Sequence, residues 1–154
     1  MTAMLLATAL GIVAGLRAMT AAAAASWAAR LGVIGVEGTW LAFLGYAWTS
    51  WIMTALALAE LVTDQLPSTP SRKVPVQFGT RIVIGAVAGA AIGMSGGSPW
   101  LGGAVGAVGA VLGTYGGAAV RGRLAARFGQ DRPAALIEDA VAIVAALAVV
   151  QVLR

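Results

Sequence analysis

The chain has 154 residues and a net charge of +4, and 60% of its residues are hydrophobic while 10% are charged. Soluble domains carry about 25% charged residues, so this chain has too few charged side chains to cover a water-facing surface. It has no cysteine and no histidine, which excludes disulfides, histidine acid–base catalysis and the usual ligands of zinc, iron–sulfur and haem sites. We therefore predict a single integral membrane domain over residues 1–154, an all-α helix bundle of about five transmembrane helices without metal or cofactor.

The first apolar segment, residues 3–29, is long enough to cross a bilayer, for which about 20 residues suffice. A secretory signal peptide is the alternative, because the alanines at 21–25 offer cleavage sites, but no basic residue precedes the apolar run. Arg17 lies near the middle of this expected transmembrane helix. A charge in mid-membrane is costly and normally faces the bundle interior or a partner carboxylate, although a shifted helix would let Arg17 reach the interface.

The second apolar segment, residues 40–66, begins with several tryptophan and tyrosine residues, which favour the membrane interface. Glu60 and Asp64 lie at its far end, four residues apart and so on one helical face. A polar loop follows, in which prolines at 67, 70 and 75 break any helix. This loop is either a site for an anionic headgroup or solute, or a connector whose charges set the topology. Its candidate binding residues are Ser68, Thr69, Ser71, Arg72 and Lys73.

Glycines are regularly spaced in the third and fourth segments, residues 80–96 and 100–120. In lipid such glycines let helix backbones approach closely, because lipid tails supply no hydrophobic drive for association. The short turn between the two segments makes them antiparallel neighbours. The predicted packing residues are Gly85, Gly89, Gly93, Gly102, Gly106, Gly109 and Gly113.

The fifth segment, residues 134–152, carries Glu138 and Asp139 in its second turn. Five spans would place the loops at 65–79 and 121–133 on the same side as the N-terminus, and most basic residues lie in these loops. The positive-inside rule then predicts a cytoplasmic N-terminus.

Part of the first segment is similar to part of the fourth, since Gly11-Ile-Val-Ala-Gly15 matches Gly109-Ala-Val-Leu-Gly113 in its glycine spacing. Segments three spans apart run in opposite directions, which is the signature of an inverted-topology repeat of segments one and two with segments four and five. Chance similarity in a chain dominated by alanine, glycine, leucine and valine is the alternative.

The ionisable residues expected in or near the membrane are candidates for a polar or transport site. Arg17 could pair with Glu60 or Glu138, either as a static ion pair that fixes helix packing or as part of a transport path. The chain has no phosphate-binding loop and no zinc-protease motif, and we do not expect an enzyme. The candidate site residues are Arg17, Glu60, Asp64, Glu138 and Asp139.

The stretch from Ala59 through Asp64 to Arg72 resembles the signature loop of an uncharacterised bacterial membrane-protein family, labelled domain of unknown function 4126. The glycine-rich segments and the stretch from Pro133 to Asp139 are similar to the same family, so the resemblance covers nearly the whole chain. It implies a small protein of the bacterial inner membrane and brings no established activity, substrate or catalytic residue.

Two functions remain open. The first is a small transporter or channel for an unknown solute or ion, with a charged intramembrane site. The second is a non-transporting assembly or lipid-organising protein, packed through its glycines, with basic loops that bind anionic lipid. Either function is compatible with a homo-oligomer formed through an exposed glycine face. The bilayer is the expected partner rather than nucleic acid, because basic residues in a membrane protein ordinarily report topology.

Overall fold

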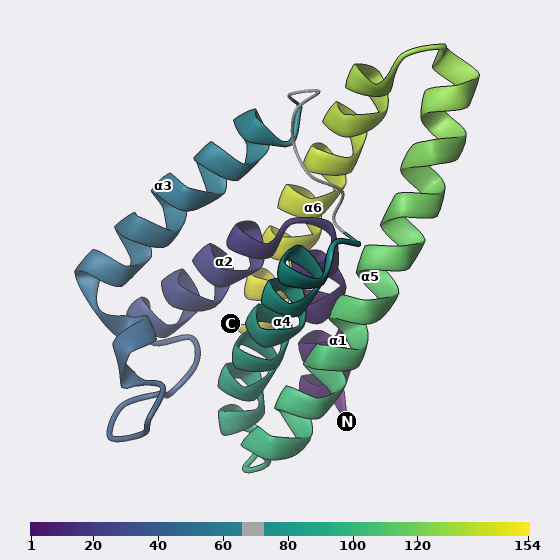
Figure 1. Ribbon diagram of the computed structural model, residues 1–154. Helices are drawn as coiled ribbons and strands as arrows, with labels where there is room; N and C mark the ends of the chain where they lie inside the picture. Colours follow the sequence, from purple (N-terminus) through teal and green to yellow (C-terminus); the bar gives the residue numbers. More distant parts are fainter. Residues whose placement is uncertain (66–72) are drawn as a thin grey trace.

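The structure is a computed structural model that describes residues 1–65 and 73–154. All regular structure in these ranges is helical, which confirms the predicted all-α class (Figure 1). The helices are α1 (Thr2–Leu16), α2 (Ala18–Arg30), the short 3₁₀ helix η1 (Ala42–Gly45), α3 (Ala47–Thr63), α4 (Pro75–Ser95), α5 (Pro99–Phe128) and α6 (Asp131–Leu153). Among them, α4, α5 and α6 are long and apolar enough to cross a membrane, whereas α1 and α3 are apolar but shorter. The described residues thus give three helices of spanning length rather than five.

The first apolar segment forms two helices, so the prediction of one transmembrane helix over residues 3–29 is wrong. Arg17 has an extended backbone, with φ −142° and ψ 101°, which ends α1 and precedes α2. From this break α2 turns back toward the end of the bundle where α1 began (Figure 1). No proline lies near Arg17, and hydropathy alone extends one helix through it. Side chains from distant helices, rather than local sequence, therefore determine the break.

The N-terminus lies at the opposite end of the bundle from most basic residues. Ala3 lies beside Gly96, in the turn between α4 and α5. Lys73, by contrast, precedes the other end of α4, and residues 121–132 lie at the far end of α5 (Figure 1). The expectation that the N-terminus and the basic loops share one side is therefore wrong, because the break adds a reversal that a single helix would not make.

Helices α1, α4 and α5 form a core with backbone contacts at glycines. A Cβ atom on Gly106 of α5 would overlap the carbonyl oxygen of Gly85 in α4, and one on Gly113 would overlap the carbonyl oxygen of Ile12 in α1. The glycines predicted to pack helices all lie at such contacts: Gly85, Gly89, Gly93, Gly102, Gly106, Gly109 and Gly113. Backbones this close gain dispersion contacts along their length, and such contacts drive helix association in lipid.

The predicted inverted relation between the first and fourth segments is wrong for the part that carries the glycines. Gly11 packs against Gly106, and Gly15 packs against Ala110 and Thr114. Residue numbers rise together along both helices, so α1 and α5 run in the same direction. The two units of an inverted repeat would run in opposite directions.

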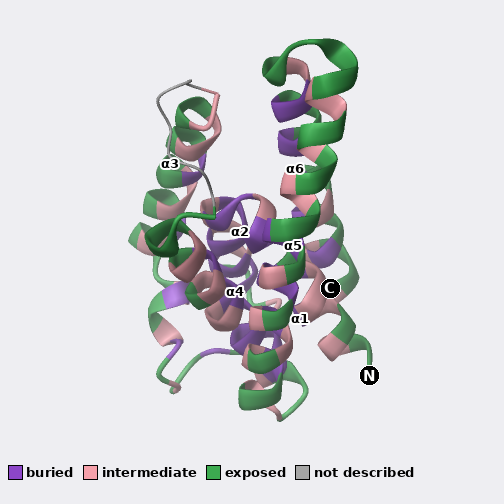
Figure 2. Cartoon of the chain, turned by 45° about the vertical axis from the view of Figure 1, so that its right-hand side comes forward, coloured by how far each residue is buried: buried purple, intermediate pink, exposed green. Residues whose placement is uncertain are grey.

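The surface outside this core is largely apolar. Buried residues gather in the middle of the bundle, and the outward faces of α5 and α6 are exposed (Figure 2). Large exposed side chains on α3 to α6 include Leu58, Val83, Val108 and Val144. Soluble proteins rarely expose apolar patches of such extent, so the surface is compatible with lipid and with a membrane protein.

Candidate functional site

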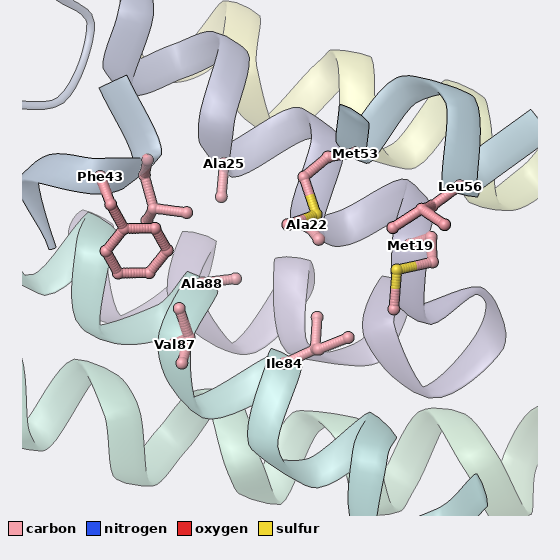
Figure 3. Close-up of a pocket in the computed structure, with 10 residues that line it drawn as sticks. Met19, Ala22, Ala25, Phe43, Met53, Leu56, Ile84, Val87 and Ala88 are labelled. Carbon is pink, nitrogen blue, oxygen red and sulfur yellow. The ribbon is translucent and has the colours of Figure 1, made fainter. Parts of the chain in front are cut away.

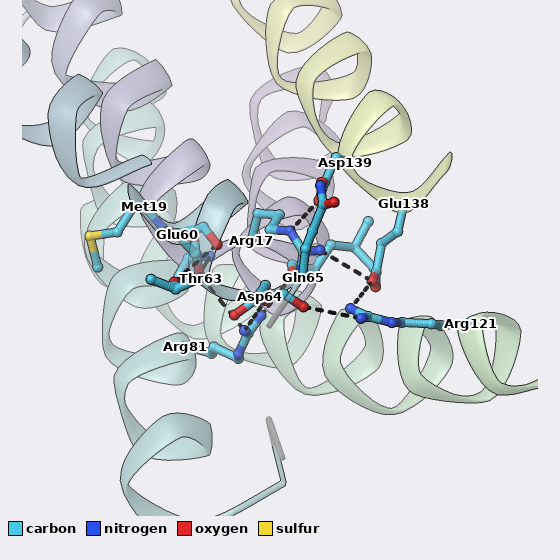
Figure 4. A network of polar contacts seen from close by, with 12 residues as sticks. Arg17, Met19, Glu60, Thr63, Asp64, Gln65, Arg81, Arg121, Glu138 and Asp139 are labelled. Carbon is cyan, nitrogen blue, oxygen red and sulfur yellow. Dashed lines mark hydrogen bonds and ion pairs between the residues drawn. The ribbon is translucent and has the colours of Figure 1, made fainter. Parts of the chain in front are cut away.

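The break at Arg17 leaves two helix ends inside the bundle, and a charged side chain from another helix binds each of them (Figure 4). At the end of α1, the Nη1 atom of Arg81 donates hydrogen bonds to the carbonyl oxygens of Gly15 and Leu16 at 2.8 and 2.7 Å. The carbonyl groups of a last helical turn have no partner within their own helix. Arg81, which lies on α4, satisfies two of them and places a positive charge at the negative end of the helix dipole.

At the start of α2 the arrangement has the opposite sign. The carboxylate of Glu60, on α3, accepts hydrogen bonds from the backbone N–H groups of Ala18 and Met19 at 3.0 and 2.9 Å. These N–H groups belong to the first turn, where no partner exists within the helix. A carboxylate at this position complements the positive end of the helix dipole, so Glu60 and Arg81 together stabilise the interrupted helix.

Arg17 itself is fully buried and lies among three carboxylates. Its Nε atom donates to Asp139 at 2.5 Å and its Nη1 atom to Asp64 at 2.5 Å, while its Nη2 atom lies 3.7 Å from the Glu138 carboxylate. Asp64 directly follows α3, and the other two acids lie on α6. A buried charge without a partner is strongly destabilising, so these acids are what make an arginine tolerable at this position.

Two further arginines share the same carboxylates. The Nη2 atom of Arg81 lies 3.7 Å from Glu60 and 3.8 Å from Asp64. Arg121, on the distal part of α5, lies 3.4 Å from Glu138 and 2.5 Å from Asp131. One ionic network therefore joins the break to α3, α4, α5 and α6. We call the following residues the charge cluster: Arg17, Glu60, Asp64, Arg81, Arg121, Glu138 and Asp139.

The structure brings together all the polar site residues that the sequence singled out: Arg17, Glu60, Asp64, Glu138 and Asp139. Of the two partners considered for Arg17, Glu138 lies within ion-pair distance. Glu60 instead binds Arg81 and the start of α2. The acids thus divide between two tasks, neutralising Arg17 and capping the interrupted helix.

Arg81 and Arg121 are the members of the charge cluster that are not among the predicted site residues, because a basic residue near a helix end is ordinarily a topology signal. Gly129 ends α5 in the left-handed conformation with φ 68°. The chain then reverses, and Arg121 meets Asp131 and Glu138 of α6. An arginine before a glycine-marked turn and acids after it are the sequence signal that could have found this contact.

Of the five residues of the predicted loop site, Lys73 lies among the described residues. Lys73 lies with its Nζ atom 5.8 Å from the centroid of the Tyr115 ring. The other predicted residues of that site lie outside the described residues: Ser68, Thr69, Ser71 and Arg72.

Residues 93–97 have the Gly-x-Ser-x-Gly spacing of a nucleophile elbow. An elbow joins a strand to a helix, whereas Ser95 is the last residue of α4. The chain has no histidine to activate a serine. This spacing therefore gives no support to serine hydrolase chemistry.

The chemistry open to the charge cluster is ionic. Within the described part of the chain, no group of three acidic side chains is arranged to hold a metal ion. Each cluster carboxylate has an arginine within 4 Å, and two of them, Asp64 and Glu138, are shared between two arginines. Shared charges can exchange partners, and a carboxylate can accept a proton.

Comparisons of the chain with protein-family models, curated proteins and solved structures find no match. The geometry of the charge cluster is therefore the main evidence for function.

Proposed function

We propose that the chain is a small membrane transporter that exchanges a charged solute for protons through rearrangement of the charge cluster. The observation that carries this proposal is the interrupted helix at Arg17, whose two ends are bound by Glu60 and Arg81. In many secondary transporters, discontinuous helices form the solute and ion sites, and their half-helix ends point at charged groups. Charged side chains inside a membrane are rare and costly, which favours a functional role.

Glu60 and Arg81 occupy the positions that a charged solute would take. An anionic group at the start of α2 would replace Glu60, and a cationic group at the end of α1 would replace Arg81. Either exchange releases an ionic link between α3 and α4, because Glu60 and Arg81 also face each other at 3.7 Å. Solute binding would thus be coupled to release of this ionic link between α3 and α4, and protons would neutralise the carboxylates when the solute leaves.

Proton flux into proteoliposomes that contain tetramethylammonium and gluconate tests this proposal, because an exchanger admits protons only as a charged solute leaves. A potassium gradient with valinomycin sets the membrane potential, and pyranine inside the vesicles reports proton entry. We expect wild-type protein to raise the flux above that of empty liposomes. Glu60→Gln and Glu138→Gln should lower it roughly tenfold or more, which corresponds to about 1.4 kcal/mol in the barrier.

Glu37→Gln is the matched control, because it makes the same chemical change at an exposed loop residue. Its flux should equal that of the wild type. Wild-type flux in both cluster variants would remove these residues from the mechanism, and the absence of flux in the wild type would rule out the transporter.

We further propose that the protein resides in the bacterial inner membrane, as its resemblance to the family labelled domain of unknown function 4126 implies. The positive-inside rule favours a cytoplasmic position for the basic end of the bundle, and the N-terminus would then face the opposite side. The chain has no cysteine, so single cysteines can report the orientation. A membrane-impermeant maleimide added to intact cells should label Thr2→Cys and leave Ala126→Cys unlabelled, and the reverse pattern would contradict this topology.

A homo-oligomer is a further part of the proposal. Gly116 on α5 is exposed and has no other helix within 4 Å of the position of a Cβ atom. Glycines on an outer helix face allow a second copy to pack closely in lipid. Disulfide formation by Gly116→Cys in membranes is expected, and only monomeric protein under oxidising conditions would count against this face.

A non-transporting assembly or lipid-organising protein is the second candidate function. The observation that favours it is that Arg17 is fully buried and makes two ion pairs of 2.5 Å. In that case the ion pairs of the charge cluster do not rearrange, and their role is to hold the helices together. Wild-type proteoliposomes would then show no flux, while removal of Arg17 would still destabilise the protein.

A further inference from the structure

A cleft of about 290 Å³ opens beside the charge cluster, between α3 and α4, with α2 as its floor (Figure 3). Met19 of α2, Met53 and Leu56 of α3, and Ile84 and Ala88 of α4 contribute to its lining, which is apolar throughout. Small-molecule sites measure roughly 300–1,000 Å³, so the cleft has room for a small apolar group or one alkyl chain.

The charge cluster lies one helical turn beyond one end of the cleft, and none of its side chains lines the cleft itself. Leu56 lies one helical turn before Glu60, and Ile84 lies one turn after Arg81, so each pair shares a helix face. The backbone N–H of Met19, a lining residue, donates to the Glu60 carboxylate. The Glu60–Arg81 ion pair therefore lies one turn beyond this end of the apolar cleft. Figure 4 shows Met19, a lining residue, beside Glu60.

The two helices that border the cleft, α3 and α4, do not pack closely against each other, and a bilayer would surround both. Helix α3 packs against α2 and η1 rather than closely against α4. The outward side chains of both helices are apolar, as Leu58 and Val83 illustrate with 61% exposure each. A ligand with an apolar body would thus enter from the hydrocarbon of the membrane.

The polar end of the cleft favours a cation. The side chain of Glu60 is 14% exposed, whereas that of Arg81 is 3% exposed. Arg81 is directed at the carbonyl oxygens of Gly15 and Leu16, and it is shared with Asp64. The more accessible charge next to the cleft is therefore the carboxylate of Glu60.

From this juxtaposition we infer that the cleft binds a single-chain cationic amphiphile, with its alkyl chain against α2 and its ammonium group beside Glu60. Flexible methionine side chains adapt to an alkyl chain, and an ammonium group makes charge-assisted hydrogen bonds to a carboxylate. The inference names the substrate class of the transporter proposed above, so the role of this ligand as a substrate rests on that proposed function. Binding itself does not require transport.

Equilibrium binding of labelled dodecylammonium to the protein in phosphatidylcholine nanodiscs, corrected for empty nanodiscs, tests the inference. Leu56→Trp fills the cleft, and Leu58→Trp places the same side chain on the outward face of the same helix. We expect saturable binding to the wild type and to Leu58→Trp. Binding to Leu56→Trp should be roughly tenfold weaker or more, a loss of about 1.4 kcal/mol.

Competition on the wild-type protein keeps the test independent of whether a variant folds. Unlabelled dodecylammonium should displace the label, whereas dodecyl sulfate, with the same chain and the opposite charge, should not. Equal displacement by both compounds would overturn the inference, as would equal binding to Leu56→Trp and Leu58→Trp. Loss of binding in discs made of phosphatidylethanolamine would assign the cleft to membrane lipid and overturn it too. Saturable binding without proton flux would uphold the site and refute only the transport function.

Discussion

The glycine-packed core of α1, α4 and α5 and the pair formed by α2 and α3 are held together by different forces. In the core, backbones meet directly at glycines such as Gly106, with no side chain between them at these positions. Between α2 and α3, small polar groups make the contacts. The hydroxyls of Ser26 and Ser50 lie 3.0 Å apart, and the indole N–H of Trp27 donates to the Thr54 hydroxyl at 2.9 Å.

This difference indicates which part of the molecule can move. Dispersion contacts between close backbones fall off steeply when helices separate, whereas hydrogen bonds and ion pairs can be exchanged for others of similar strength. Arg17 is the single extended residue that connects α1 of the core to α2. We therefore expect substitutions to be most damaging in the core, less so in the charge cluster and least between α2 and α3.

The largest effect is expected from a side chain inserted into the core. Gly106→Val would place a branched side chain against the backbone of α4, so the helices could not close and folded protein should be lost. Size-exclusion chromatography in detergent and circular dichroism measure this loss. Gly122→Val adds the same side chain to an exposed position on the same helix and should behave as the wild type. Full folding of Gly106→Val would show that the core tolerates wider helix separation.

A smaller but still large effect is expected at the centre of the charge cluster. Arg17→Gln leaves Asp64, Glu138 and Asp139 without their shared partner, and the free energy of unfolding should fall by about 3–5 kcal/mol. Unfolding by titration with a denaturing detergent measures the change. The control is Arg30→Gln, at the exposed end of α2. Equal stability of the two variants would mean that the buried ion pairs make no net contribution.

The smallest effect is expected between α2 and α3. Ser50→Ala removes a buried hydroxyl that lies 3.0 Å from the hydroxyl of Ser26, while Ser26 keeps its bond to Leu44. The free energy of unfolding should fall by about 1 kcal/mol, the usual value for one hydrogen bond. Thr80→Ala, which removes an exposed hydroxyl bonded within its own helix, should change it less. A loss as large as that of Arg17→Gln would contradict the division into two regions.

Much of the architecture could be predicted because its signals are local. Pro75 and Pro99 begin α4 and α5, and Gly129 follows the end of α5, all of them common helix-boundary residues. Regular glycine spacing indicated which helix faces pack closely. The candidate site could be predicted in part for a similar reason, because Arg17 and Glu60 stand out as charges in apolar sequence.

The break at Arg17 could not be predicted, because its causes lie far away in the chain. The alanine-rich residues that follow it favour a continuous helix by intrinsic propensity. The interrupted helix is stable because Glu60 and Arg81 bind its two ends from other helices. A prediction that misses the break also gives the wrong direction for the chain after Arg17 and places the N-terminus at the wrong end of the bundle.

The spacing of glycines on α5 also limits how its neighbours can slide along it. Gly102 and Gly106 are four residues apart and both face α4, which corresponds to a step of about 6 Å at a rise of 1.5 Å per residue. A shorter shift would bring the carbonyl groups of α4 against side chains of α5 instead of glycines. Axial movement in the core is therefore restricted to discrete registers, and small displacements must occur elsewhere in the bundle.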